Sequence, residues 1–212
     1  LSGFELRYRN INWARTKELV RNGELDGLVG TSKSTLIRTP YYFPKTALGF
    51  SEICFFKRAE DDWVYLTPAS LDSRIMGWIN DYRFTADKDL DDWVNKNKGT
   101  SRIETVFGDE DLHNRLFQML QLSRIDTFPE NRFVVLYGLK RMRLEKVIDI
   151  AGCTGLRELV YVAFSRKIPD GMVLANALDS GVERLRKTGR LNEILGKYGS
   201  SQQEMMPTNT VE

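Results

Sequence analysis

Hydrophobic positions along this chain alternate between two spacings. Phe4, Leu6 and Tyr8 alternate with charged residues, a period of two that predicts a half-buried strand. From Ala14 onward, apolar residues at intervals of three and four predict a helix. Gly23 ends that helix, because glycine takes the left-handed conformation at a helix end without steric cost. A short apolar run over residues 25–29 then predicts a buried strand.

The rest of the chain repeats this exchange of strand and helix. Strands are predicted over residues 53–56, 74–79, 103–107 and 159–164, the last of them after a turn-rich stretch over 151–155. Helices are predicted over residues 87–97, from 108 onward, and over 131–141, 175–185 and 191–198. Alternation of the two kinds of element is typical of α/β layering rather than of a helical bundle or a sandwich.

The order of elements between residues 13 and 38 is similar to that of a known protein family. A helix beginning near Trp13 is followed by the stop Gly23-Glu24-Leu25-Asp26, a short strand, and then Thr35-Leu36-Ile37-Arg38. This order and spacing resemble those of the bacterial extracellular (periplasmic) solute-binding proteins of the amino-acid-binding type, family 3. The stretches 162–167, 181–189 and 194–198 are similar to the closing pattern of that family. The resemblance implies a two-lobe α/β fold of the type II periplasmic-binding-protein class, with a ligand cleft between lobes that are each a central sheet flanked by helices.

The resemblance also implies a second lobe inserted whole into the first. We expect lobe 1 over residues 1–52 and 164–199, hinge strands over 53–57 and 158–163, lobe 2 over 58–157, and a disordered tail over 200–212. The charged turn over 57–62 marks the first boundary. Family members begin with a central strand and a helix of the first lobe, and this chain starts after them, so we expect a longer natural precursor with a signal peptide.

Several ligand residues of lobe 1 follow from the resemblance. Trp13 falls where the family has a cleft aromatic that stacks on the ligand, and packing between helix and sheet is the alternative for this side chain. Arg38 falls where the family has an arginine that pairs bidentately with a ligand carboxylate, and a solvated surface arginine is the alternative. Gly30 and Thr31 belong to the turn that completes the carboxylate site. Lys33 occupies a turn position where many members carry a small hydroxyl residue.

Four further candidates come from lobe 2. Asp81 and Tyr82 follow the strand over 74–79, at the loop that in the family closes over the ligand. The stretch Arg124-Ile125-Asp126 resembles the motif before the acidic residue that holds a ligand ammonium, which falls near Glu130 or Asn131.

The cation at Lys33 changes the expected ligand. We expect an acidic or carboxylate-bearing small molecule rather than an ordinary α-amino acid, unless Glu130 pairs with the ligand ammonium or with Lys33.

The composition of the chain bears on its size class and on its possible binding partners. The chain of 212 residues is long enough for one sizeable core or two small ones. Its 31 Lys and Arg residues are scattered and nearly balanced by 29 Asp and Glu residues, which disfavours nucleic acid. No apolar run approaches the roughly 18 residues of a membrane span, and the first residues do not form a secretion signal. Cys54 and Cys153 lack the spacing of a zinc site or redox motif, which favours buried thiols, with a disulfide as the alternative.

Catalysis finds little support in the sequence. His113 has no nucleophile or metal-ligand partner at a recognisable spacing, so we expect a solvated helix residue. Four acids could suggest acid chemistry or calcium, but they lack the glycine-bearing loop and terminal glutamate of a calcium site and favour a charged helix start: Asp87, Asp89, Asp91 and Asp92. Glu130 with Lys33 could exchange protons in principle. No cofactor and no metal is expected.

These expectations lead to a function. The resemblance implies an extracytoplasmic protein, not an enzyme, that captures a small carboxylate-bearing solute, amino-acid-like or an organic acid, for the membrane subunit of an ABC-type transporter. Two alternatives stay open: a ligand-sensing domain of a membrane signalling receptor, and a dehydratase-like enzyme on the same fold.

Overall fold

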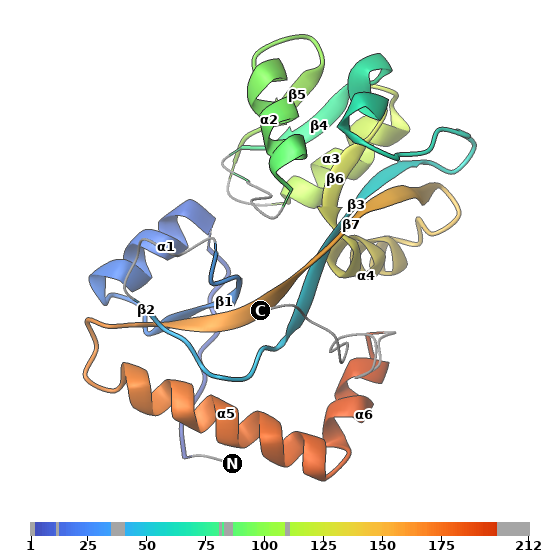
Figure 1. Cartoon of the computed structure of the whole chain (residues 1–212). Coiled ribbons are helices and arrows are strands. Elements are labelled where there is room, and N and C mark those ends of the chain that lie inside the picture. The colour runs from blue at the N-terminus through green and yellow to red at the C-terminus, as the bar shows by residue number, and fades with distance from the viewer. Residues whose placement is uncertain are drawn as a thin grey trace. The chain divides into compact units, whose positions relative to one another are not determined.

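Helices and strands are mixed throughout the molecule (Figure 1), so the predicted α/β class is confirmed. The computed structural model describes residues 3–11, 13–34, 41–80, 82, 87–108 and 111–198. The chain divides into two compact units, which we call unit 1 (Leu1–Phe50 and Glu158–Glu212) and unit 2 (Ser51–Arg157). The predicted disordered tail over 200–212 lies outside the described residues.

No helix in the described part of the chain combines the length and the apolar content that a membrane span requires.

Unit 1 is built on the C-terminal part of one long strand, β7 (Ile148–Ser165). Strands β1 (Gly27–Thr31) and β2 (Tyr41–Tyr42) both pair with it antiparallel. The helices of this unit are α1 (Trp13–Asn22), α5 (Gly171–Lys187) and α6 (Arg190–Gly196). A small core joins α1 to the three strands: Val20, Leu28, Tyr41 and Ala163 are buried, and Trp13, Leu25 and Phe43 pack against them.

The end of α1 is determined by one glycine, as predicted. Gly23 has a φ of +83°, and the amide of Glu24 beyond it donates to the carbonyl of Leu19 at 2.9 Å, which satisfies an otherwise free helix-end carbonyl. A Cβ at Gly23 would lie 2.8 Å from Cβ of Lys167, so the chain also approaches too closely there for a larger residue. The chain can therefore turn from α1 directly into β1.

Unit 2 contains the other helices and strands. The strands are β4 (Met76–Ile79), β5 (Ile103–Val106), β6 (Phe128–Asn131) and the N-terminal part of β7, together with most of β3 (Gly49–Arg58). The helices are the short η1 (Pro68–Ser73), α2 (Lys88–Asn97), α3 (Leu112–Gln121) and α4 (Arg132–Met142). β4 pairs parallel with β5, and β6 pairs antiparallel with β3. The bounds of β4, β5, α2 and α4 lie within two residues of the predicted ones, whereas β3 and β7 are longer than predicted and β6 and η1 were not predicted.

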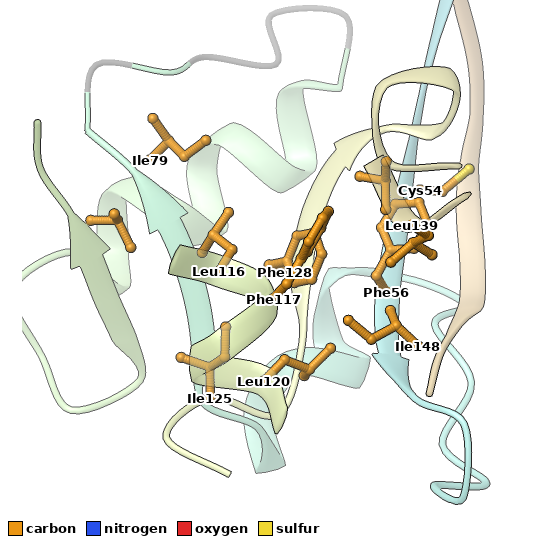
Figure 2. Close-up of a cluster of buried hydrophobic side chains, with 12 residues drawn as sticks. Cys54, Phe56, Ile79, Leu116, Phe117, Leu120, Ile125, Phe128, Leu139 and Ile148 are labelled. Carbon is orange, nitrogen blue, oxygen red and sulfur yellow. The ribbon is translucent and has the colours of Figure 1, made fainter. Parts of the chain in front are cut away.

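Three phenylalanine side chains pack together in the larger core of unit 2 (Figure 2). Phe56 of β3 stacks on Phe128 of β6 with ring centroids 5.4 Å apart, and Phe117 of α3 packs against Phe128 at 5.8 Å. Buried aromatic pairs of this kind contribute roughly 0.5–1.5 kcal/mol beyond the area that they bury. This core fixes α3 and α4 against β3 and β6.

The predicted strand over Phe4, Leu6 and Tyr8 is wrong. Residues 4–11 lie in no helix or strand, and these three side chains are 52%, 89% and 74% exposed. Their period of two describes an amphipathic strand, but a strand also needs a neighbour for its hydrogen bonds, and the described sheets place none beside them. The alternation of apolar and charged residues alone was therefore not enough to predict a strand here.

The predicted turn over residues 151–155 is also wrong, because β7 runs through it without a break. Gly152 has a φ of +155°, and a Cβ there would lie 2.4 Å from the carbonyl oxygen of Tyr65. The amide of Tyr65 in turn donates to the carbonyl of Ala151 at 3.1 Å. Glycine within a strand often marks a place where another backbone segment approaches closely, and Gly152 is such a place.

Cys54 and Cys153 form a disulfide with an S–S distance of 1.99 Å, so the expectation of free buried thiols is wrong. Cys54 lies on β3 and Cys153 on β7, which are hydrogen-bonded neighbours. Both strands also continue from one unit into the other, β3 across Phe50 and Ser51 and β7 across Arg157 and Glu158. The disulfide therefore joins the two strands through which the chain crosses between the units.

Removal of this disulfide should destabilise the protein. The double variant Cys54→Ala, Cys153→Ala should lose about 2–4 kcal/mol of free energy of unfolding, because the bond closes a loop of residues 99 apart in the sequence. Urea denaturation with and without a reductant measures the effect. Reductant should bring the wild type down to the variant and leave the variant unchanged. Equal stability of wild type and variant under oxidising conditions would contradict the prediction.

Candidate functional site

The turn after β1 gathers most of the predicted ligand residues of unit 1. Gly30 has a φ of +86°, and the pairing of β1 with β7 shifts register between Val29 and Thr31. A residue in this conformation at a bulge is typically glycine. After the bulge, Thr31 is buried and its hydroxyl donates to the carbonyl of Ser32 at 3.3 Å. The bulge thus turns the end of β1 out of the regular ladder.

Side-chain hydroxyls connect this turn to β7. The hydroxyls of Ser32 and Ser34 lie 2.9 Å apart, and Ser34 donates to the carboxylate of Glu158 on β7. Thr31 lies opposite Tyr161 in the strand register. The turn is therefore fixed from both sides, by strand pairing before it and by the Ser34 hydrogen bond after it.

Lys33 lies in the middle of this turn. Its Nζ stands 4.6 Å from the ring centroid of Tyr161, a cation–π contact with a side chain that is 6% exposed. Such a contact favours a position of the ammonium near the ring face. The structure therefore brings Gly30, Thr31 and Lys33 together.

Trp13 is the first residue of α1 and packs against the small core of unit 1. Lys17, one turn later, places its Nζ 5.9 Å from the Trp13 ring centroid. This position matches the packing alternative, and contact of Trp13 with a ligand stays a prediction. The stretch Thr35-Leu36-Ile37-Arg38 and the residue Asp81 lie outside the described residues, so the roles of Arg38 and Asp81 also stay predictions.

The described candidates of unit 2 are the buried carboxylate of Glu130 and two residues next to it, Tyr82 and Asn131. Glu130, on β6, is 5% exposed; its Oε2 lies 2.8 Å from Nε2 of His113, and its Oε1 accepts from the amide of Asn131 at 2.7 Å. Tyr82 packs against both cores of the unit. Its pKa is raised, first by burial and then by the negative charge of Glu130. Tyr82, Glu130 and Asn131 therefore form one group together with His113.

Asn131 serves as the N-cap of α4. Its Oδ1 accepts from the amides of Phe133 at 2.9 Å and Val134 at 3.3 Å, while its Nδ2 donates to the hydroxyl of Ser51 at 2.9 Å. Asparagine is among the best residues for this position. The side chain thus positions the start of α4 and ties it to β3.

The expectation that His113 is solvated is wrong. Its side chain is 34% exposed and pairs with the carboxylate of Glu130. Burial of the ring opposes its charged form, but the hydrogen bond and the charge of Glu130 outweigh burial, so the pKa of His113 is raised above 6.5. The helical spacing indicates that His113 lies on the buried face of α3, because it precedes the buried residues Leu116, Phe117 and Leu120 by three, four and seven positions.

A buried carboxylate in unit 2 that pairs with two arginines was not predicted from the sequence. Glu52 of β3 is 6% exposed and accepts from Nη1 of Arg132 at 3.1 Å and from Nε of Arg157 at 3.3 Å. Among the described residues, ligand atoms of Glu52, Cys54 and Cys153 lie within 4.8 Å of one another, as a metal site would require. The sulfurs are joined to each other and the carboxylate is bound by two arginines, so these atoms are engaged without a metal.

The acidic cluster near α2 is a helix start, as predicted. Asp87 caps α2 by accepting from the amide of Leu90 at 3.0 Å, and Asp89 and Asp91 lie in the first turn, where negative charge is favourable. Asp92 pairs with Lys88. These contacts account for the cluster without a bound cation.

Comparison with known proteins rests on solved structures, since no family model and no curated protein matches the sequence. One similar structure is the arginine-bound substrate-binding protein AbpA of an amino acid ABC transporter from Streptococcus pneumoniae, with a TM-score of 0.70 and 14% identity, covering 92% of this chain and 77% of that one. Another comes from work on glutathione import through GshT and the cystine ABC importer TcyBC of Streptococcus mutans, with a TM-score of 0.71 and 13% identity, covering 93% and 79%.

A third similar structure is a histidine kinase sensor domain with similarity to periplasmic binding proteins, with a TM-score of 0.67 and 15% identity, covering 89% of this chain and 76% of that one. At these identities the likeness concerns the fold. The predicted two-lobe α/β fold of the type II periplasmic-binding-protein class is thereby confirmed.

Substitution of Glu130 should change the titration of His113. In Glu130→Gln the pKa of His113 should fall below 6.5, because burial still opposes the charge and the carboxylate no longer favours it. NMR follows the ring of His113 directly, since the chain has 1 histidine. Glu104→Gln, at an exposed position of β5, is the matched control and should leave the pKa unchanged.

The same pair should make stability depend on pH. Since the pKa of His113 is raised on folding, its stabilisation is fully present below pH 6.5 and is lost as the pH rises through the folded-state pKa. Denaturation curves over this range should show that loss in the wild type and not in Glu130→Gln. An unchanged pKa of His113 in Glu130→Gln would contradict the pairing.

Proposed function

We propose that this protein captures a small carboxylate-bearing molecule, either amino-acid-like or an organic acid, outside the cytoplasm and delivers it to the membrane subunit of an ABC-type transporter. The observation that carries the proposal is the turn after β1, where a glycine bulge is followed by the buried Thr31 and by Lys33 over Tyr161. A lysine ammonium is a donor suited to a carboxylate. The fold shared with amino-acid-binding proteins of ABC transporters supports the rest.

Arg38 is the proposed main carboxylate ligand of this half-site. It follows Lys33 by five residues, and a guanidinium presents two parallel N–H donors that match both oxygens of a carboxylate. In unit 2, the proposed ligand residues are Asp81, Tyr82, Glu130 and Asn131. The proposal includes Trp13 as an aromatic contact.

No catalytic role is part of the proposal. The Nε2 atom of His113 is engaged by Glu130, and the similar proteins are described as binding proteins or a sensor domain. The sensor domain supports one second candidate function, in which the same ligand-binding fold reports ligand to a signalling module. Transport is the preferred reading because two of the similar structures, AbpA and the one from the work on GshT and TcyBC, are described in connection with ABC transporters.

A thermal-shift screen tests the proposal. Amino acids, organic acids, amines and sugars are added to the protein, each carboxylate alongside its amide. A ligand at a hundredfold excess over its Kd stabilises the native state by about 2.7 kcal/mol, and each kcal/mol raises the Tm of a chain of this size by roughly 2–4 °C. We expect shifts with carboxylates and not with their amides. Shifts with amines or sugars alone would contradict the proposal.

The substitution Arg38→Ala should abolish binding of the carboxylate found in this screen. Loss of charge-assisted hydrogen bonds costs about 1.5–3 kcal/mol each, so the Kd should rise by roughly one hundredfold or more. Calorimetric titration measures the Kd, and the unliganded Tm checks the fold. Arg21→Ala, an exposed arginine on α1, is the matched control and should bind normally. Unchanged affinity in Arg38→Ala would remove Arg38 from the site.

A further inference from the structure

We propose that the reduced protein binds a divalent cation of the zinc class between the thiolates of Cys54 and Cys153 and the carboxylate of Glu52. The disulfide is then the closed, metal-free form of this site. The inference rests on the placement of these three side chains in unit 2 and is independent of the proposed ligand site. Ligand atoms of all three lie within 4.8 Å of one another.

The strands β3 and β7 hold the three side chains together even without the S–S bond. The Cα atoms of Cys54 and Cys153 are 3.9 Å apart on hydrogen-bonded neighbours, so reduction leaves the two thiols side by side. Glu52 precedes Cys54 by two residues on β3, which places both side chains on the same face of the strand. Strand pairing therefore builds the site from residues up to 99 positions apart, a spacing that no local zinc motif has.

The separation of these ligand atoms suits one zinc ion. Zinc holds thiolate sulfur at about 2.3 Å and carboxylate oxygen at about 2.0–2.2 Å, so two of its ligands lie at most about 4.5 Å apart. Once the S–S bond is open, rotation about the Cα–Cβ bonds moves the sulfurs apart without a shift of the strands. Two thiolates favour zinc over the harder magnesium and calcium ions. Three protein ligands leave the fourth tetrahedral position for water.

The arginines that bind Glu52 are compatible with a metal. Arg132 donates to its Oε2 at 3.1 Å and Arg157 to its Oε1 at 3.3 Å, and each carboxylate oxygen has two lone pairs. The arginines thus orient the carboxylate, as outer-shell partners do in metal sites, and leave a lone pair on each oxygen for the metal. Zn²⁺ and two thiolates together carry no net charge, so the bound metal adds no charge beside the guanidinium groups.

The group lies next to solvent on one side. Cys54 and Glu52 are buried, but Cys153 is only partly buried, and the side chains of Arg132 and Arg157 are 36% and 43% exposed. A reductant and a metal ion therefore have access to the group at Cys153.

A dithiol reductant opens the site. Its two thiols are oxidised to a disulfide, the S–S bond between Cys54 and Cys153 breaks, and each cysteine sulfur takes up one electron and one proton. Zinc then displaces both protons and forms two Zn–S bonds. Oxidation of the two cysteines reverses these steps and releases the metal.

Cobalt and zinc titrations of the full chain test the proposal. The protein is reduced with a dithiol, which is then removed without air. Co²⁺ should give thiolate-to-cobalt charge-transfer absorption with the reduced wild type and none with the oxidised wild type, and Zn²⁺ should displace the cobalt. Zn²⁺ should also raise the Tm of the reduced protein only, because the metal binds the folded site.

Two variants show whether the three named side chains hold the metal. Glu52→Gln should raise the Kd for Zn²⁺ at least about tenfold, since the loss of an outer-shell partner alone costs about 10–100-fold. Cys153→Ser retains one thiolate and should lose about half of the charge-transfer absorption. Glu104→Gln, at an exposed position of β5, is the matched control and should bind Zn²⁺ like the wild type. The Tm of oxidised Glu52→Gln checks its fold.

Three results would overturn the proposal. One is the absence of charge-transfer absorption in the reduced wild type. Another is equal Zn²⁺ affinity of the wild type and Glu52→Gln, because the two thiols would then bind without the carboxylate. If Glu52→Gln does not fold, the third decides: a reduced wild type whose Tm does not rise with Zn²⁺. None of these results bears on carboxylate binding, so the proposed function is tested separately.

Discussion

The pairing of β3 with β7 is the interaction on which the rest of the structure depends. These neighbouring strands carry the chain across both boundaries between the units. The other strands of their sheet attach to them: β1 and β2 to β7, and β6 to β3. Two further contacts reinforce the pair, the disulfide between Cys54 and Cys153 and the ion pair between Glu52 and Arg157.

Several candidate site residues are positioned by these two strands. In unit 1, the turn that follows β1 is fixed by Tyr161 and Glu158, which both lie on β7. In unit 2, the register of β6 places Glu130 opposite Cys54 and Asn131 opposite Ile53 of β3. Among the described candidates, Thr31 and Lys33 therefore lie where β1 ends against β7, and Glu130 and Asn131 lie where β6 ends against β3.

The sequence predicted local features well. The helix stop at Gly23, the start of α4 near residue 131 and the acidic start of α2 all depend on residues close together in the sequence, which a local pattern can report. Periodicity also located the strand residues 53–56 and 159–164, which lie within β3 and β7. The family resemblance added the two-lobe arrangement, which local patterns do not contain.

Errors arose where partners are distant in the sequence. Cys54 and Cys153 are 99 residues apart, and their pairing depends on strand neighbours that no local pattern specifies. Glu130 of β6 and His113 of α3 meet only through the packing of the helix, so the sequence pattern indicated neither the partial burial of His113 nor its raised pKa. Phe4, Leu6 and Tyr8 show the converse case, a good strand pattern without a strand beside it.

The central claim is that the turn from Gly30 to Lys33 forms part of a carboxylate site. A crystal structure grown with a saturating mixture of amino acids and organic acids tests it most directly. The proposed function predicts a bound molecule with a carboxylate against this turn and against Arg38. A bound molecule elsewhere, with this turn free of ligand, would contradict it.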